Sequence, residues 1–301
     1  EDSQVQLSDY RDNDVVYYCM YDEDKADGHI QKNKWREIWR PEDAYEEDED
    51  EDKYWYWLEK DGKAYIPDSD DMKATGYAYD LGDGALEVDG SQFSFAKKKI
   101  NSKDYFFNAD GEMLSDFVNV VHTEDANVID LGMYYFGGSS DGSMKTGSQT
   151  VKDDNGDSFK FYFGTKDNNT TGEAKGKGVT GNKNNKLYYM GHLVAAQDYK
   201  YQPVFMDVAG NGEEATFIVN QNGSIQHSAL EYKEDGDILI DAKTNKVEFK
   251  TKNSSSKVWD KYSVEKGSLI INVEDIDEKD VMPISTDVIA SGSVVSGSKP
   301  Q

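Results

Sequence analysis

The residues best suited to binding a ligand are aromatic and lie near the N-terminus. Four of the five tryptophans, Trp35, Trp39, Trp55 and Trp57, fall within one short stretch of the chain. Exposed indole rings can form a platform for the apolar face of a sugar ring. The alternative is that they form the core of the first hairpins. The sequence Trp55-Tyr56-Trp57 favours a core position for some of these rings, because neighbouring residues of a strand point to opposite faces and cannot all be exposed.

The patterns that could indicate a metal site are incomplete. The run 46–52 carries seven acidic residues in succession, which predicts a solvated loop because like charges repel. Asp22 to Gly28 partly resembles a calcium loop, but the third acid is displaced and the closing glutamate is missing. The four histidines are far apart in the sequence. We therefore predict no metal and no cofactor.

Two glycine-rich patterns match enzyme motifs by spacing alone. Residues 138–142 fit a nucleophile elbow, and residues 176–181 fit a dinucleotide-binding loop. Both motifs need a helix after a strand, and the chain shows no sustained apolar spacing typical of a helix. We therefore predict no catalytic residues and no enzyme activity.

The charge of the chain limits its partners. There are 59 acidic and 33 basic residues, so the formal net charge is −26. Nucleic acids and anionic membrane surfaces are bound through basic residues, so neither is expected as a partner. No apolar stretch is long enough for membrane insertion, and Cys19 has no second cysteine with which to pair. A polyanion would be repelled, which favours a neutral glycan as the ligand.

The aromatic residues recur with a period. Triplets begin at residues 105, 134, 161, 188 and 217, which are 29, 27, 27 and 29 positions apart, and more divergent copies begin at 17 and 56. Most triplets are followed by Asp-Gly or Asn-Gly, which tolerate the positive φ of a two-residue hairpin turn. Each unit therefore predicts a β-hairpin. A lone hairpin is marginally stable, so neighbouring hairpins must cover one another.

These features predict an all-β fold, an elongated solenoid of stacked β-hairpin repeats with irregular insertions and a small β C-terminal cap. We expect four parts along the chain. They are divergent N-terminal hairpins with the acidic insertion (1–95), a regular hairpin array (96–229), the β cap (230–283) and a flexible Ser/Gly/Val tail (284–301).

Two of the repeats carry a resemblance to a known family. Residues 104–114 and 133–147 resemble the cell-wall-binding repeats of Gram-positive surface proteins, a family that includes choline-binding, glucan-binding and clostridial toxin repeats. The resemblance implies an exported, wall-associated protein that binds wall polymer or another glycan. It also implies an aromatic cage built from a leading Trp and an aromatic residue after a closing Gly. Only Trp55 and Tyr77 keep these positions, which argues against choline as the ligand.

We therefore expect a secreted or cell-wall-associated, non-catalytic protein that binds cell-wall polysaccharide or another neutral glycan. Two alternatives stay open: a structural spacer or adhesion stalk without sugar binding, and an accessory module of a wall-active enzyme. The sequence leaves the oligomeric state open. The predicted ligand-binding residues are Trp35, Trp39, Trp55, Trp57 and Tyr77.

Overall fold

The computed structural model describes most of the chain between residues 29 and 284. The described ranges are 29–40, 53–82, 84–167, 174–197, 199–208, 214–228, 230–234, 237–242, 246–250, 255–259, 269–271 and 282–284. The predicted acidic loop (46–52), the partial calcium loop (22–28), the first aromatic triplet (17–19) and the tail beyond residue 284 lie outside these ranges.

Every regular element in the described ranges is a β-strand, so the all-β prediction is confirmed. These ranges contain no helix of the length and hydrophobicity needed to cross a membrane. The strands form five sheets, and all pairings are antiparallel except that of β13 with β20.

Two sheets make up the first half of the chain. One is a hairpin of β1 and β2, and the other has the strand order β5-β4-β3-β6-β7. Their strands are β1 (Lys34–Trp39), β2 (Lys53–Leu58), β3 (Ala74–Gly82), β4 (Ala85–Ile100), β5 (Lys103–Asn108), β6 (Phe117–Thr123) and β7 (Gly132–Tyr135).

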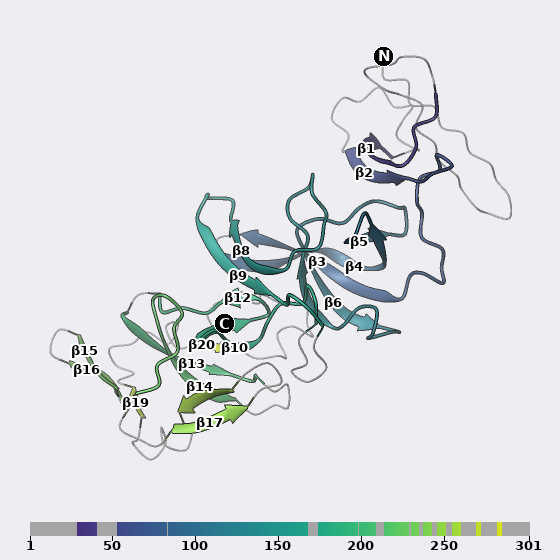
Figure 1. Ribbon diagram of the computed structural model, residues 1–301. Helices are drawn as coiled ribbons and strands as arrows, with labels where there is room; N and C mark the ends of the chain where they lie inside the picture. Colours follow the sequence, from purple (N-terminus) through teal and green to yellow (C-terminus); the bar gives the residue numbers. More distant parts are fainter. Residues whose placement is uncertain are drawn as a thin grey trace.

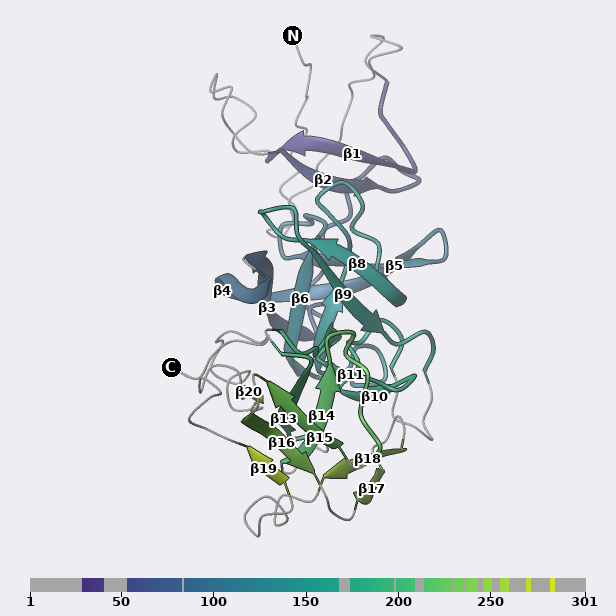
Figure 2. The same cartoon turned by 90° about the vertical axis from the view of Figure 1, so that its left-hand side faces the viewer.

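Three sheets make up the second half, with the orders β10-β11-β12-β9-β8, β17-β18-β14-β13-β20 and β15-β16-β19. Both views place the β1–β2 hairpin at one end of the molecule and β17 near the other (Figure 1, Figure 2). The first of these sheets contains β8 (Gly147–Lys152), β9 (Ser158–Phe163), β10 (Gly181–Lys183), β11 (Lys186–Tyr189) and β12 (His192–Leu193). The other two contain β13 (Tyr201–Met206), β14 (Ala215–Asn220), β15 (Leu230–Glu234), β16 (Asp237–Ala242), β17 (Lys246–Lys250), β18 (Ser255–Trp259), β19 (Leu269–Ile271) and β20 (Met282–Ile284).

The turns after the aromatic triplets differ from the two-residue form that the sequence predicted. After β5, the N–H of Asn108 donates to the carbonyl of Glu112 at 3.0 Å, which leaves a three-residue loop ending in Gly111. Gly111 has φ of +81°, the geometry of a type I turn followed by a bulge. The Asn108 side chain closes this loop, because its Oδ1 accepts the N–H groups of Asp110 and Glu112. In this loop the Asn108 side chain, three residues before the glycine, therefore acts together with the Asp-Gly pair.

The hairpins are linked to one another by one or two backbone hydrogen bonds each. In each link the returning arm of one hairpin donates an N–H to the first arm of another hairpin, and in three links the acceptor is the residue before the aromatic triplet. The links are Met113 to Trp55 (2.9 Å), Met144 to Asp104 (2.8 Å), Gly178 to Met133 (2.7 Å) and Ile225 to Asn185 (3.0 Å).

A second link between hairpins is made by methionine and glycine. The Met113 side chain fills the space that a Cβ on Gly142 would occupy, and Met144 fills the same space at Gly176. Both glycines lie in the turn of the following hairpin and have positive φ. A side chain at either position would therefore push the two hairpins apart.

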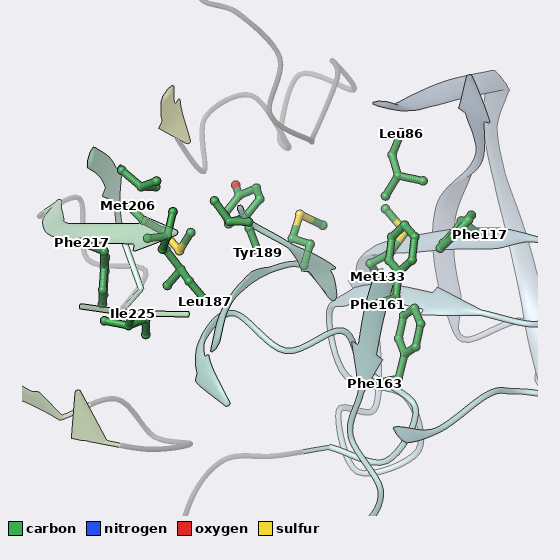
Figure 3. Packing of buried hydrophobic residues seen from close by; sticks show 14 of the residues in the cluster. Leu86, Phe117, Met133, Phe161, Phe163, Leu187, Tyr189, Met206, Phe217 and Ile225 are labelled. Carbon is green, nitrogen blue, oxygen red and sulfur yellow. The ribbon is translucent and has the colours of Figure 1, made fainter. Parts of the chain in front are cut away.

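Most rings of the aromatic triplets are buried. Tyr105, Phe106, Phe107, Phe136, Phe161, Phe163 and Phe217 are all at most 6% exposed. The largest cluster of buried side chains has members from Tyr79 to Ile225 (Figure 3), and separate smaller clusters contain Phe106, Tyr56 and Trp57. Side chains of three sheets meet in the largest cluster.

The four predicted parts of the chain stay a prediction. The boundary after residue 95 falls inside β4, which continues to Ile100. Within 230–283, β18 pairs with β14 and β20 pairs with β13, so these strands extend the sheet of the preceding hairpin.

Candidate ligand-binding site

The tryptophans are positioned by the β1–β2 hairpin. Its register places Trp35 opposite Trp57 and Glu37 opposite Trp55. Because side chains alternate along a strand, Trp35, Trp55 and Trp57 share one face, and Tyr56 points to the other. Tyr56 accordingly packs in a separate cluster with Leu58 and Ala64.

The tryptophan face of the hairpin packs against β5. The ring centroid of Trp35 is 4.8 Å from that of Tyr105, 5.4 Å from that of Trp57 and 5.8 Å from that of Phe107. Trp57 is only 7% exposed and belongs to the cluster formed with Ile100, Tyr105 and Phe107. Trp57 is therefore a core residue, while Trp35 and Trp55 are partly exposed beside it.

A pocket of about 390 Å³ opens where these elements meet. Its apolar wall consists of the rings of Trp35, Trp55 and Tyr105 and the thioether of Met113. Its polar wall consists of Lys103, Ser140 and Asp141. Three rings and a few polar groups around an open pocket can hold a sugar ring by stacking and hydrogen bonding.

The polar wall is partly occupied by internal contacts. Burial opposes the charged form of Asp141, but hydrogen bonds from Lys145 and Ser143 outweigh it and hold the pKa of this carboxyl below its usual range. Asp141 is therefore ionised at neutral pH. Burial, together with the charge of Asp141, raises the pKa of Tyr105, so its phenol stays neutral and can donate a hydrogen bond.

The remaining predicted residues lie elsewhere. Tyr77 is in β3, where its hydroxyl donates to Oε1 of Gln92 at 3.4 Å and its ring packs against the largest core cluster. Trp39 is the last residue of β1, opposite Lys53, and its side chain lies outside the described part of the structure. The structure thus brings Trp35 and Trp55 together at the pocket, with Trp57 behind them, and leaves Tyr77 apart.

Sequence reasoning missed the rest of the pocket. The sequence shows Tyr105 only as the first residue of an aromatic triplet, and Asp141 only as part of the Asp-Gly pair that follows the next triplet. Their position follows from the links between hairpins, since Met113 bonds to Trp55 and packs over Gly142, next to Asp141. The available signal was the methionine that stands two residues after Gly111 and again two residues after Gly142.

No metal site is found in the part of the chain that the structure describes, where no three His, Cys, Asp or Glu residues are grouped as ligands. Glu112 contacts the tryptophan hairpin through Tyr56 and is 3% exposed. It accepts hydrogen bonds from Arg40 at 2.6 Å, Asn108 at 2.7 Å and Tyr56 at 3.3 Å. Glu112 therefore fixes the hairpins to one another.

Comparisons with known proteins found only weak structural similarity. No protein-family model matches the chain, and no curated protein matches it. Among solved structures, it is similar to choline binding protein F from Streptococcus pneumoniae (18% identity, TM-score 0.27) and to CbpJ from the same species (16% identity, TM-score 0.15). Each alignment covers 74% of this chain, with 58% of the first protein and 80% of the second. Another structure of the first protein, in complex with ipratropium, aligns at a TM-score of 0.28, and this chain spans 60% of it. TM-scores this low carry no argument about fold or ligand.

Proposed function

We propose that this chain is a non-catalytic, extracellular module that binds a cell-wall glycan, and that the pocket of Trp35, Trp55 and Tyr105 is its binding site. The observation that carries the proposal is the meeting of these three rings at a pocket whose lining also includes polar groups. Stacking on the rings would supply affinity, and the polar wall would orient the sugar.

The links between hairpins support a stacked arrangement of the repeats. The same N–H to carbonyl bond recurs in front of three aromatic triplets, and the methionine-to-glycine contact recurs in two successive turns. We propose that these contacts keep the β-hairpins stacked as a solenoid although irregular insertions separate them in the sequence. Such an array fits the resemblance of residues 104–114 and 133–147 to wall-binding repeats, and with it a secreted or wall-associated location.

A quaternary ammonium group is the other ligand that three rings can hold, by cation–π attraction. Lys103 lies at this pocket and would repel such a cation, and the carboxylate of Asp141 is already bonded to Lys145 and Ser143. These contacts favour an uncharged sugar ring in the aromatic part of the site.

A structural spacer is the second candidate function. The specific observation in its favour is the burial of the triplet rings, which leaves no row of exposed aromatics along the described hairpins. On this view the pocket is a shallow gap between packed hairpins.

The test is sedimentation of the purified chain with purified Gram-positive cell walls, with and without a chelator, and with free choline as a competitor. Glycan binding predicts co-sedimentation that survives both the chelator and choline. Loss of binding in choline would assign the pocket to a quaternary ammonium, and no binding to walls would favour the spacer. Release of soluble wall fragments by the purified chain would overturn the non-catalytic assignment.

A further inference from the structure

The link that builds the aromatic pocket recurs one hairpin further along the chain. Met113 donates its backbone N–H to the carbonyl of Trp55 at the pocket. Met144 donates in the same way to the carbonyl of Asp104. Each methionine also packs over the turn glycine of the hairpin that follows it. The two steps between hairpins therefore share one framework, and their residues can be matched position by position.

The match shows which parts of the aromatic pocket recur at the second step. Tyr105 corresponds to Tyr134, the first ring of the next triplet, so this ring is kept. Three other positions change from aromatic or acidic to charged residues of another kind: Trp55 becomes Asp104, Trp35 becomes Lys97, and Asp141 becomes Lys175. Trp35 and Lys97 correspond because each stands opposite the residue two places after the acceptor carbonyl, and Asp141 and Lys175 each precede the turn glycine.

The charged residues of the second step are bonded to protein groups. Nζ of Lys175 lies 2.8 Å from Oδ2 of Asp104, whose side chain is 5% exposed. Nζ of Lys97 donates to the carbonyl of Val128 at 2.9 Å. The ring of Tyr134 is 3% exposed, and its hydroxyl donates to the carbonyl of Asp130 at 3.0 Å. The second step therefore presents no exposed ring on which a sugar could stack.

The third step is closed by the hydrophobic core. Gly178 donates its N–H to the carbonyl of Met133, which takes the position of Trp55. Met133 is 0% exposed, and Phe161, the first ring of the next triplet, is 1% exposed. Both side chains belong to the largest core cluster, so no ligand can reach this position.

We propose that these three steps carry a single sugar-binding site, and that the Asp104–Lys175 ion pair closes the place where a second would lie. This inference rests on the proposed function and gives the stoichiometry of that same site. A repeated polymer gains avidity only when it engages several sites at once. With one site, the chain holds a wall polymer at one point and gains nothing from the repetition of its sugars.

The experiment measures how many chitotetraose molecules bind per chain, by titration calorimetry and by native mass spectrometry. The proteins are the wild type, Trp55→Ala, Lys175→Gln and the control Lys166→Gln, whose lysine is exposed in the loop after β9. Circular dichroism first establishes that each variant is folded.

We expect one chitotetraose per wild-type chain, with an affinity at least about tenfold weaker in Trp55→Ala. Lys175→Gln should still bind one molecule, with an affinity within about twofold of the wild type. Its urea midpoint should fall below that of Lys166→Gln, because the buried carboxylate of Asp104 loses its closest partner.

Two or more molecules per wild-type chain, of which Trp55→Ala loses one, would overturn the inference and leave the proposed function standing. Equal urea midpoints for Lys175→Gln and Lys166→Gln would overturn the closing role of the ion pair. If the wild type binds no chitotetraose, or a folded Trp55→Ala binds it as the wild type does, both proposals fail.

Discussion

The backbone N–H of Met113 donates to the carbonyl of Trp55 at 2.9 Å, and the side chains of both residues line the same pocket. The bond that joins two hairpins therefore also builds the candidate site. Met113 in turn packs over Gly142 in the next hairpin. The stability of the stack and the shape of the pocket thus depend on the same few contacts.

Gly142→Ala should lower the free energy of unfolding by about 2–4 kcal/mol, because the new Cβ overlaps the Met113 side chain and φ is +60°. Urea denaturation measures the change. Gly156→Ala is the control for backbone strain, since its φ is +86° and nothing lies within 4 Å of the added Cβ. Equal losses in the two variants would show that the Met113 contact contributes nothing.

Glu112→Gln should destabilise the chain by about 1–3 kcal/mol. The buried carboxylate holds Arg40, Asn108 and Tyr56, and the amide cannot replace the ion pair with Arg40. Chemical denaturation of the variant measures the loss. Asp110→Asn, in the exposed loop beside it, is the matched control and should change stability by less than about 0.5 kcal/mol. A similar small effect for Glu112→Gln would contradict the linking role of this carboxylate.

The hairpins could be predicted from sequence because their signals are local. A run of aromatic residues followed by Asp-Gly or Asn-Gly specifies a strand and a turn within about ten residues. The three-residue loop was missed because Asn108 closes it through side-chain bonds that a dipeptide pattern does not include. The long strand β4 was missed because Gly90 and the lysines of 97–99 are poor strand formers, and its stability comes from pairing with β3 and β5.

Of the residues in the candidate site, only the tryptophans could be predicted from the sequence. Trp35 and Trp55 lie close in sequence, and a hairpin between them is a local inference. Tyr105 and Asp141 reach the pocket through contacts between hairpins, and the register of those contacts has no signature in a single sequence. Tyr77 was grouped with the tryptophans because of a repeat pattern, but the structure places it in β3 beside Gln92.

Acidification should destabilise the fold through His192. This side chain keeps some exposure, but its ring stacks on Phe161 at 4.7 Å and lies near Phe159, and burial lowers its pKa to about 4. An unfolded histidine has a pKa of about 6.5, so the unfolded state binds more protons between these values. The stability that neutral His192 provides is therefore complete above about pH 6.5 and is lost as the pH falls toward 4.

The pH effect is measured by the free energy of unfolding of the wild type and His192→Phe at pH 7 and pH 4. Phenylalanine keeps the ring contact and has no charge to gain. Partial exposure reduces the effect, so the wild type should lose about 1–2 kcal/mol more than the variant. An equal loss in both proteins would show that His192 is not the group that responds.

The rings of Trp35 and Trp55 are proposed to hold a sugar, and titration of chitotetraose into wild type, Trp55→Ala and Tyr77→Ala measures this binding. Circular dichroism and thermal unfolding first establish that each variant is folded. Trp55→Ala should weaken affinity at least about tenfold, which corresponds to about 1.4 kcal/mol, while Tyr77→Ala should bind as the wild type does. Unchanged affinity in a folded Trp55→Ala, or an equal loss in Tyr77→Ala, would contradict it.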